Sequence, residues 1–303
     1  MDFKQLEAFV AIAKHKSFSK AAESLYITQP TISTHIKNLE YELNATLINR
    51  SSKKIHLTEA GAILHKYAVD ILNKRDYAIY SLNNYKGKIE GLLEISASSV
   101  PEEHLLPKML MSFSENFPDV RYRISKYDSG MILKKIIQGE INFGIVGSKA
   151  DSGKLEYIRI MSDEIILAAP PKEMYSSLGE IYPGDLKAFK FILREKGSGT
   201  RKALEDALSG HGMSLSDLSV SALIENNRTI VECIKKDMGL TFLSKNVVAK
   251  DIENGSVISI PVSGMDIKRD FYFVYNRSMA LSPLAEAFKN FVLDKVDKND
   301  LLM

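Results

Sequence analysis

The sequence contains a single cysteine, Cys233, among 303 residues. One thiol can form neither an intramolecular disulfide nor a cysteine-based metal cluster, so we expect no metal site and a reducing compartment. Long apolar runs are also missing: no stretch of about 18 apolar residues occurs, and the charged first residues lack the apolar run of a signal peptide. These absences predict a cytoplasmic protein with no membrane partner.

Motifs of catalysis are absent as well. The sequence has no HExxH, no GxSxG and no GxxxxGKS or GxxxxGKT, so the signatures of zinc proteases, serine hydrolases and P-loop nucleotide hydrolases are missing. The six histidines are scattered; we expect His15, His56 and His65 at the surface, whereas His104 and His211 could approach a cleft. We therefore expect a protein that is not an enzyme and that holds no cofactor.

Charge is unevenly distributed along a chain that is longer than one ordinary domain. Residues 1–90 contain 13 Lys/Arg against 9 Asp/Glu, a net of +4, whereas residues 91–303 contain 27 against 29, a net of −2. A basic first part on a near-neutral body is what binding to a polyanion requires, although this asymmetry alone does not identify one.

Residues 3–43 predict three helices, with a tight corner between the second and the third. Apolar side chains recur at helical spacing, and Ser17 or Ser19 can cap the second helix. Thr28 can cap the third helix, and Pro30 falls in its first turn, where the missing N–H costs little. This arrangement is typical of a helix-turn-helix, whose second helix enters the major groove of DNA. The polar outer face of that helix is expected to carry Thr31, Thr34, His35, Lys37 and Asn38, with Ser33 and Gln29 near its start.

A basic loop follows this helical unit. Arg50, Lys53 and Lys54 lie between the apolar segments 47–48 and 55–57, which predicts a β-wing that places cations along the phosphate backbone. The alternative interpretation of this region is a small helical bundle whose polar face is merely solvated.

Residues 3–61 resemble the winged helix-turn-helix of the LysR-type transcriptional regulators. The positions that match the family pattern are Phe9, Ser17, Phe18, Ala21, Ala22, Leu25, Gln29, Pro30, Ser33, Ile36, Leu39, Glu40, Leu47, Arg50, Leu57, Thr58 and Gly61. The resemblance implies that residues 1–60 bind double-stranded DNA, with Arg50 and Lys53 on phosphates. The residues that it implies face the groove are Gln29, Pro30, Thr31, Ser33, His35 and Lys37. Thr34 departs from the pattern, because many family members carry Arg there, so a frequent DNA contact is expected to be absent.

Residues 58–87 predict one long linker helix, since residues 62–86 contain neither Pro nor Gly. The residues that recur in it every seven positions are Leu64, Ile71, Ala78 and Tyr85. Such a stripe is typical of a dimer seam, interrupted here by Arg75; the alternative is a helix that packs on its own domain. The family resemblance implies a homodimer through this helix and favours a tetramer, with RNA polymerase as a further candidate partner.

From residue 91 onward, short apolar segments alternate with helical patterns, which predicts an α/β fold. The expected strands are 91–98, 121–127, 142–147, 164–170, 190–195, 221–225, 240–244 and 271–276. The expected helices lie near 103–116, 130–138, 200–211 and 228–237. This part resembles the family's effector-binding domain, a two-lobed fold similar to periplasmic binding proteins. The two subdomains are expected at 91–162 with 268–303 and at 163–267, with the ligand in the cleft between them.

Two turns of the body could hold a small anion in that cleft. Residues 197–200 follow a strand and open a helix, so their backbone N–H groups and hydroxyls would attract an anion, and Ser98 and Ser99 form a second such turn. The alternative is a plain glycine-rich turn, and Arg201 could either bind the anion or pair with Glu205. The candidate effector-binding residues are Ser98, Ser99, Asp128, Ser129, Gly197, Ser198, Gly199, Thr200, Asn226 and Asn227.

The run from Arg194 to Arg201, RExGSGTR, resembles the family branches that regulate sulfur-oxyanion assimilation or carbon fixation. This resemblance ranks a sulfur-type oxyanion first as the effector and a phosphorylated or carboxylated metabolite second. We therefore predict a ligand-responsive, homo-oligomeric transcription regulator that reads a dyad-symmetric DNA site. The alternative is a two-lobed solute-binding or enzymatic protein whose helical head serves only oligomerisation.

Overall fold

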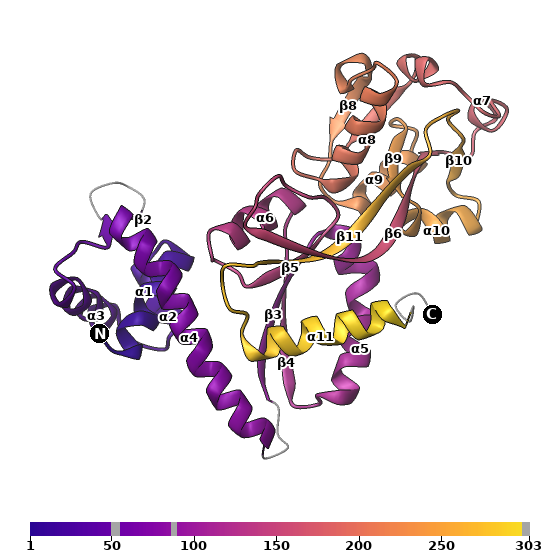
Figure 1. The fold of residues 1–303 in the computed structure, drawn as a ribbon. Helices are drawn as coiled ribbons and strands as arrows, with labels where there is room; N and C mark the ends of the chain where they lie inside the picture. Colours follow the sequence, from indigo (N-terminus) through magenta and orange to yellow (C-terminus); the bar gives the residue numbers. More distant parts are fainter. Residues whose placement is uncertain (50–54, 86–89, 299–303) are drawn as a thin grey trace.

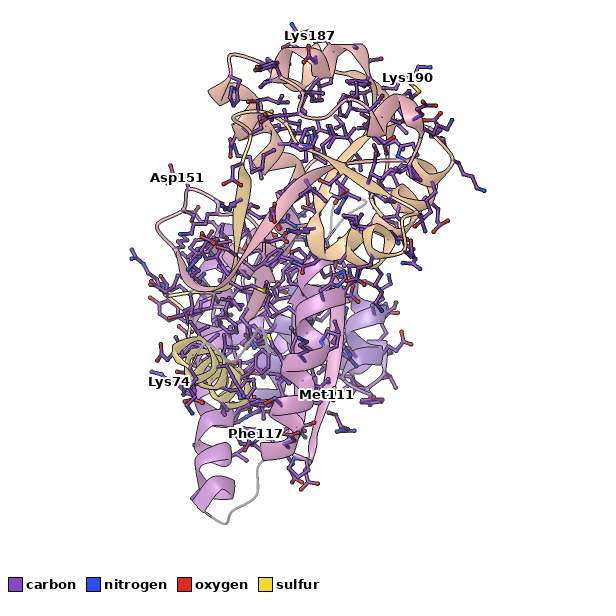
Figure 2. All side chains as sticks on the ribbon, turned by 90° about the vertical axis from the view of Figure 1, so that its right-hand side faces the viewer. Lys74, Met111, Phe117, Asp151, Lys187 and Lys190 are labelled. Carbon is purple, nitrogen blue, oxygen red and sulfur yellow. The ribbon has the colours of Figure 1, made fainter. Side chains whose placement is uncertain are left out.

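The computed structural model describes residues 1–49, 55–85 and 90–298. The chain forms a small helical head, one long helix and a two-lobed α/β body (Figure 1). The elements of the head are α1 (Phe3–His15), α2 (Phe18–Ser24), α3 (Gln29–Glu42), β1 (Ile48–Asn49) and β2 (His56–Leu57). Figure 2 gives the view from the side, with Lys187 at the far end of the body and Lys74 of the long helix near the other end.

Local hydrogen bonds set the start of each head helix. Asp2 and Gln5 cap α1 reciprocally, whereas Ser17 caps α2 and Thr28 caps α3 by accepting from the backbone N–H three residues on. Between α2 and α3 the chain turns at Tyr26, whose φ of 55° lies in the left-handed region. The predicted caps and the tight corner are therefore confirmed.

An apolar core holds these helices together, and α3 contributes one face to it. Ile32, Ile36 and Leu39 of α3 are fully buried against α1. Glu40 Oε1 accepts from the backbone N–H of Leu47 at 2.8 Å, which ties α3 to the first wing strand. The opposite face of α3 is consequently left to solvent.

The long helix α4 (Glu59–Tyr85) closes the head and leads away from it (Figure 1). Thr58 Oγ1 accepts from Gly61 N at 3.0 Å, as the sequence predicts for a cap. Gly61 is required by close packing, because a Cβ there would lie 2.1 Å from the carbonyl oxygen of Leu47. The head and its long helix thus share one folded unit.

The stripe that recurs every seven residues was predicted to form a dimer seam, and this prediction is wrong for the first half of α4. Leu64 and Ile71 pack, half buried, against the core of the head, together with the fully buried Ala68. The alternative, a helix packed on its own domain, holds there because these side chains of α4 complete the apolar core around α1. Among the α4 side chains that the structure describes, the large apolar ones that are exposed are Ile63, Tyr67, Ile79 and Leu82.

The body contains one seven-stranded mixed sheet and one two-stranded sheet. The strands are β3 (Gly91–Ala97), β4 (Val120–Lys126), β5 (Phe143–Val146), β6 (Leu155–Ala169), β7 (Lys190–Leu193), β8 (Ser219–Leu223), β9 (Thr241–Ser244), β10 (Ile258–Ile260) and β11 (Ile267–Asn276). In the large sheet the order is β10-β6-β11-β5-β3-β4, with β9 also on β6, and β7 pairs with β8. The eight predicted strands are all present, whereas β10 was not predicted.

Helices cover these sheets on both lobes (Figure 1). They are α5 (Leu106–Asn116), α6 (Ser129–Ile137), α7 (Glu173–Ser176), α8 (Gly199–Gly210), α9 (Asn227–Lys235), α10 (Lys245–Glu253) and α11 (Pro283–Asp297). Helical turns lie at Pro101–Leu105, Pro183–Ala188 and Leu215–Asp217. Four of these helices were predicted near their observed positions; α7, α10 and α11 were not.

Two strands, β6 and β11, run from one lobe into the other (Figure 1). They pair antiparallel from Ile165 with Ile267 to Leu155 with Asn276. Lobe 1, with β3 to β5, α5, α6 and α11, has its own aromatic core, in which the rings of Phe143 and Phe273 stack 4.7 Å apart. Lobe 2, with β7 to β10 and α7 to α10, has separate cores. The paired strands therefore join two independently packed lobes.

The head lies against lobe 1. Lys14 Nζ is 3.0 Å from Glu94 Oε2, so α1 is tied to β3. On α4, Asn73 Nδ2 donates to Ala280 O at 2.5 Å and Asp70 Oδ1 accepts from Ala280 N at 3.1 Å. Ala280 follows the end of β11, so the strand that connects the lobes is also tied to the long helix.

Candidate DNA-binding surface and effector cleft

The outer face of α3 carries the residues that the sequence places there. Those that are exposed are Gln29, Pro30, Thr31, Thr34 and Lys37. Those that are half buried are Ser33 and His35. Five of these seven residues are therefore open to a partner that approaches α3 from outside.

Several of these side chains already have partners within the head. Thr34 Oγ1 donates to the carbonyl oxygen of Pro30 at 3.0 Å, and the hydroxyls of Thr28 and Thr31 lie 2.8 Å apart. Among the described residues, the side chains of His35 and Lys37 have neither a hydrogen bond nor an ion pair. Because the hydroxyl of Thr34 is used inside the helix, its methyl group is what it presents to a groove, whereas Lys37 keeps its full set of donors.

The wing strands form as predicted. β1 and β2 pair antiparallel, with Ile48 opposite Leu57 and Asn49 opposite His56. The cations predicted to contact phosphates, which are Arg50, Lys53 and Lys54, lie outside the described residues.

The predicted effector residues of the two lobes meet in one cleft. From lobe 1 the cleft is lined by Ser98, Ser99, Val100, Asp128 and Ser129. From lobe 2 and β11 it is lined by Arg194, Glu195, Ser198, Gly199, Thr200 and Arg269. Its volume of about 10 Å³ corresponds to roughly one water molecule. The two hydroxyl-rich turns do face each other, and they do so at close range.

Helix starts from both lobes point at this cleft. Asp128 caps α6 by accepting from Met131 N at 2.9 Å, and Ser198 caps α8. Gly197 has a φ of 101°, and a Cβ there would lie 2.3 Å from Asp128 Oδ1, so only glycine fits. Gly130 N donates to Gly197 O at 3.3 Å across the lobes. The glycine run therefore serves the close approach of the lobes as well as the turn.

Arg194 is a central cleft residue that sequence reasoning did not single out as a ligand. Its side chain is only 4% exposed. Nη2 donates to Ser99 Oγ of the other lobe at 3.3 Å, and Nη1 donates to Asn227 Oδ1 at 2.5 Å. Nε and Nη2 bind the two carboxylate oxygens of Glu195, each at 2.8 Å. An arginine directly after a buried strand was the available signal.

A second buried cation, Arg269 on β11, was also missed. Nε donates to Asp163 Oδ2 at 2.9 Å and Nη1 donates to Thr200 Oγ1 at 2.9 Å. Nη2 lies 2.9 Å from the same Asp163 oxygen but is not aligned for a hydrogen bond. Burial lowers the pKa of Arg269, and the Asp163 carboxylate opposes that effect. Asp163 and Thr200 thus hold the guanidinium of Arg269 in a fixed position in the lining of the cleft.

Three sequence expectations need correction at this point. Asn226 does not line the cleft: it is exposed and caps α9 by accepting from Thr229 N at 3.0 Å. Asn227 is buried and reaches the cleft only through Arg194. His65 is not at the surface but 5% exposed, because α4 turns it toward Phe9 in the core of the head.

The remaining alternatives are also decided by geometry. Arg201 pairs with Glu205, Nε to Oε1 at 3.0 Å, as the second of its two interpretations proposes. Neither His104 nor His211 lines the cleft, and His211 Nε2 instead lies 3.0 Å from Gly264 O.

Within the described residues no helix is long and apolar enough to cross a membrane, and no group of three or more His, Cys, Asp or Glu side chains could hold a metal ion.

Comparison with known proteins gives two family matches. Residues 3–62 match the bacterial regulatory helix-turn-helix protein of the lysR family, and residues 86–297 match the LysR substrate binding domain. A probable RuBisCO transcriptional regulator of Porphyra purpurea is 31% identical over 292 residues, which is 95% of this chain and 92% of that protein. The HTH-type transcriptional regulator CysL of Bacillus subtilis is 31% identical over 293 residues, 96% of this chain and 94% of that one.

A solved structure extends the likeness to the whole arrangement. A full-length variant of OxyR from Pseudomonas aeruginosa, in which aspartate replaces one cysteine, superimposes with a TM-score of 0.73. The match covers 98% of this chain and 97% of that one at 18% sequence identity, which is a statement about fold. Head, long helix and two-lobed body are therefore arranged together much as in that protein.

Proposed function

The chain belongs to the LysR family of bacterial transcription regulators, and we propose that a small anion bound between its lobes controls how it binds DNA. One observation carries this proposal. Hydroxyl-rich turns of both lobes and two buried arginines converge on a single cleft, while the polar face of α3 is left exposed. The first feature suits an oxyanion and the second suits a DNA groove.

We further propose that the regulator acts as a homo-oligomer on a dyad-symmetric site. The apolar side chains that α4 exposes offer a surface that a second copy would cover, and a two-fold axis imposes the same symmetry on the DNA site. A tetramer, contact with RNA polymerase, and a cytoplasmic, non-enzymatic role complete the proposal. We propose a DNA-binding domain at residues 1–60, a linker and dimerisation helix at 58–87 and an effector-binding domain at 91–303. The two lobes of the effector-binding domain are 91–162 with 268–303, and 163–267.

The chemistry of the cleft supports an oxyanion as the effector. Helix starts α6 and α8 direct their partial positive ends at it, and the hydroxyls of Ser99, Ser129 and Thr200 add donors. Arg194 can offer two parallel N–H groups to a planar or tetrahedral oxyanion. We rank a sulfur-type oxyanion first and a phosphorylated or carboxylated metabolite second.

A route from cleft to head is provided by β11. Arg269 near one end contacts Thr200 in the cleft, and Ala280 beyond the other end is bonded to Asp70 and Asn73 of α4. A change in lobe closure would therefore move the long helix that carries the head. To switch the protein, the anion must bind the two arrangements with different affinity, typically by about 1–3 kcal/mol of coupling.

A thermal-shift screen of the full-length protein tests the proposal. Sulfate, thiosulfate, sulfite, inorganic phosphate and simple carboxylates are compared with sodium chloride at equal ionic strength. A bound anion at 100 times its dissociation constant adds about 2.7 kcal/mol to the free energy of unfolding, which raises the melting temperature by several degrees. Equal melting temperatures in all salts would refute an anion-binding cleft.

A further inference from the structure

The charges around the cleft do not suit an anion as they stand. Two cations, Arg194 and Arg269, are matched by three carboxylates: Asp128 and Glu195 line the cleft, and Asp163 is paired with Arg269 behind it. The sum of these five charges is −1. An incoming anion would be repelled, and the penalty is large where the surroundings are desolvated. Moving one of the three carboxylates away, or neutralising it, would relieve this repulsion when an anion binds.

Two of the carboxylates are held in place. Asp163 is fully buried and accepts from Ser244 Oγ at 2.7 Å, from Asn246 Nδ2 at 2.9 Å and from Arg269. Removing it would leave a buried guanidinium without a counter-ion. Asp128 accepts from Met131 N at the start of α6, so its departure would uncap that helix.

Glu195 differs from both in that it can move. Its side chain is 18% exposed, and within the described residues its only hydrogen-bond partner is Arg194. It lies in the turn before Gly197, whose carbonyl oxygen accepts from Gly130 N across the lobes. Among the described residues, a rotation of the Glu195 side chain toward solvent therefore breaks only its hydrogen bonds to Arg194, and it takes place next to a hydrogen bond between the lobes.

The position that Glu195 occupies is the one an effector needs. Its Oε2 and Oε1 bind Nε and Nη2 of Arg194 in a two-point arrangement, each at 2.8 Å. Two oxygens of a sulfate, phosphate or carboxylate would bind the same edge in the same way. On the other edge, Nη1 donates to Asn227 and Nη2 donates to Ser99, so the edge of Nε and Nη2 is the one that a two-point ligand already occupies.

We propose that Glu195 is a built-in counter-ion that the effector displaces from Arg194. This inference rests on the proposed anion-binding function and specifies its mechanism. Displacement removes one negative charge from the cleft and hands the two N–H groups of Arg194 to the ligand. It also predicts selectivity, because an anion with two suitably spaced oxygens can replace a carboxylate on this edge, whereas chloride cannot.

Isothermal titration of the full-length protein with sodium sulfate and, separately, with sodium phosphate, in a chloride buffer of constant ionic strength, tests the inference. Glu195→Gln removes the charge and keeps the shape, and the matched control is Glu232→Gln, which neutralises a carboxylate paired with Lys235 on the surface of α9. We expect the dissociation constant for sulfate to fall about tenfold in Glu195→Gln and to stay unchanged in Glu232→Gln, as befits loss of a charged hydrogen-bonded competitor. Glu195→Ala should shift it in the same direction.

The outcomes separate the inference from the function on which it rests. If the wild type binds sulfate or phosphate and Glu195→Gln binds it equally or more weakly, Glu195 positions Arg194 and is not a competitor, so the inference fails alone. If neither the wild type nor Glu195→Gln binds either anion, the anion cleft and the inference fail together.

Discussion

Arg269 donates to Thr200 Oγ1 at 2.9 Å, which joins the strand that connects the lobes to the first turn of α8. Both side chains are buried, so Thr200→Val leaves one N–H of the guanidinium without a partner. We expect the free energy of unfolding to fall by about 1–3 kcal/mol, measured by urea denaturation. DNA affinity should be unchanged while the response to the anion is blunted; an intact anion titration would remove Thr200 from the pocket.

Lys37 on α3 is exposed and has no partner among the described residues, so its charge is available to a phosphate. Lys37→Ala should weaken binding to all duplex DNA and reduce the slope of log affinity against log salt by about one. Anisotropy titrations at several salt concentrations measure both. Lys187→Ala, at the far end of lobe 2 (Figure 2), is the control and should bind DNA like the wild type.

Thr34 offers the reverse experiment. Its side chain is exposed and its hydroxyl is bonded to Pro30 O, so an arginine in its place can extend outward without breaking the helix. Thr34→Arg should tighten DNA binding and steepen the salt slope by about one, because it adds one phosphate contact. Ser209→Arg adds the same charge at the end of α8. Equal gains in the two variants would mean that residue 34 does not face DNA.

Stability should depend on pH through His65. Burial lowers the pKa of this imidazole below 6.5, against the opposing effect of Glu140, so folding favours the neutral form. The contribution of His65 is complete above pH 6.5 and is lost as the pH falls through its lowered pKa, at no more than about 1.4 kcal/mol per pH unit. Denaturation at pH 8.0 and 5.5 measures this loss.

Replacing His65 separates it from other titrating groups. His65→Gln should have a smaller difference in unfolding free energy between the two pH values, whatever its absolute stability. His56→Gln, on the exposed β2, should retain the difference seen in the wild type. If His65→Gln kept the wild-type difference in unfolding free energy between the two pH values, the pH dependence would belong to other titrating groups.

Local signals explain what the sequence could predict. The caps at Ser17, Thr28 and Thr58 are formed within a few residues, so the sequence alone places the helix starts. The same holds for the turns at 98–99 and 197–200, which follow buried strands. Because both turns lie at strand ends of a two-lobed sheet, their meeting at one cleft follows from the fold class.

Pairs that are distant in sequence explain the rest. Asp163 and Arg269 are far apart along the chain, and their pairing depends on the register of β6 with β11. The role of Glu195 likewise depends on which way Arg194 turns. His65 was misplaced because one helix face can pack on its own domain or on a second copy, and spacing does not distinguish the two.

The most direct test of the account is the footprint of the full-length protein on a DNA duplex selected from a random pool. We predict that an interrupted inverted repeat is selected, and that a saturating anion, found in the thermal-shift screen, changes the footprint length in the wild type but not in Arg194→Ala. Selection of no dyad, or the same footprint with and without the anion in the wild type, would contradict the claim that the cleft controls how the heads bind DNA.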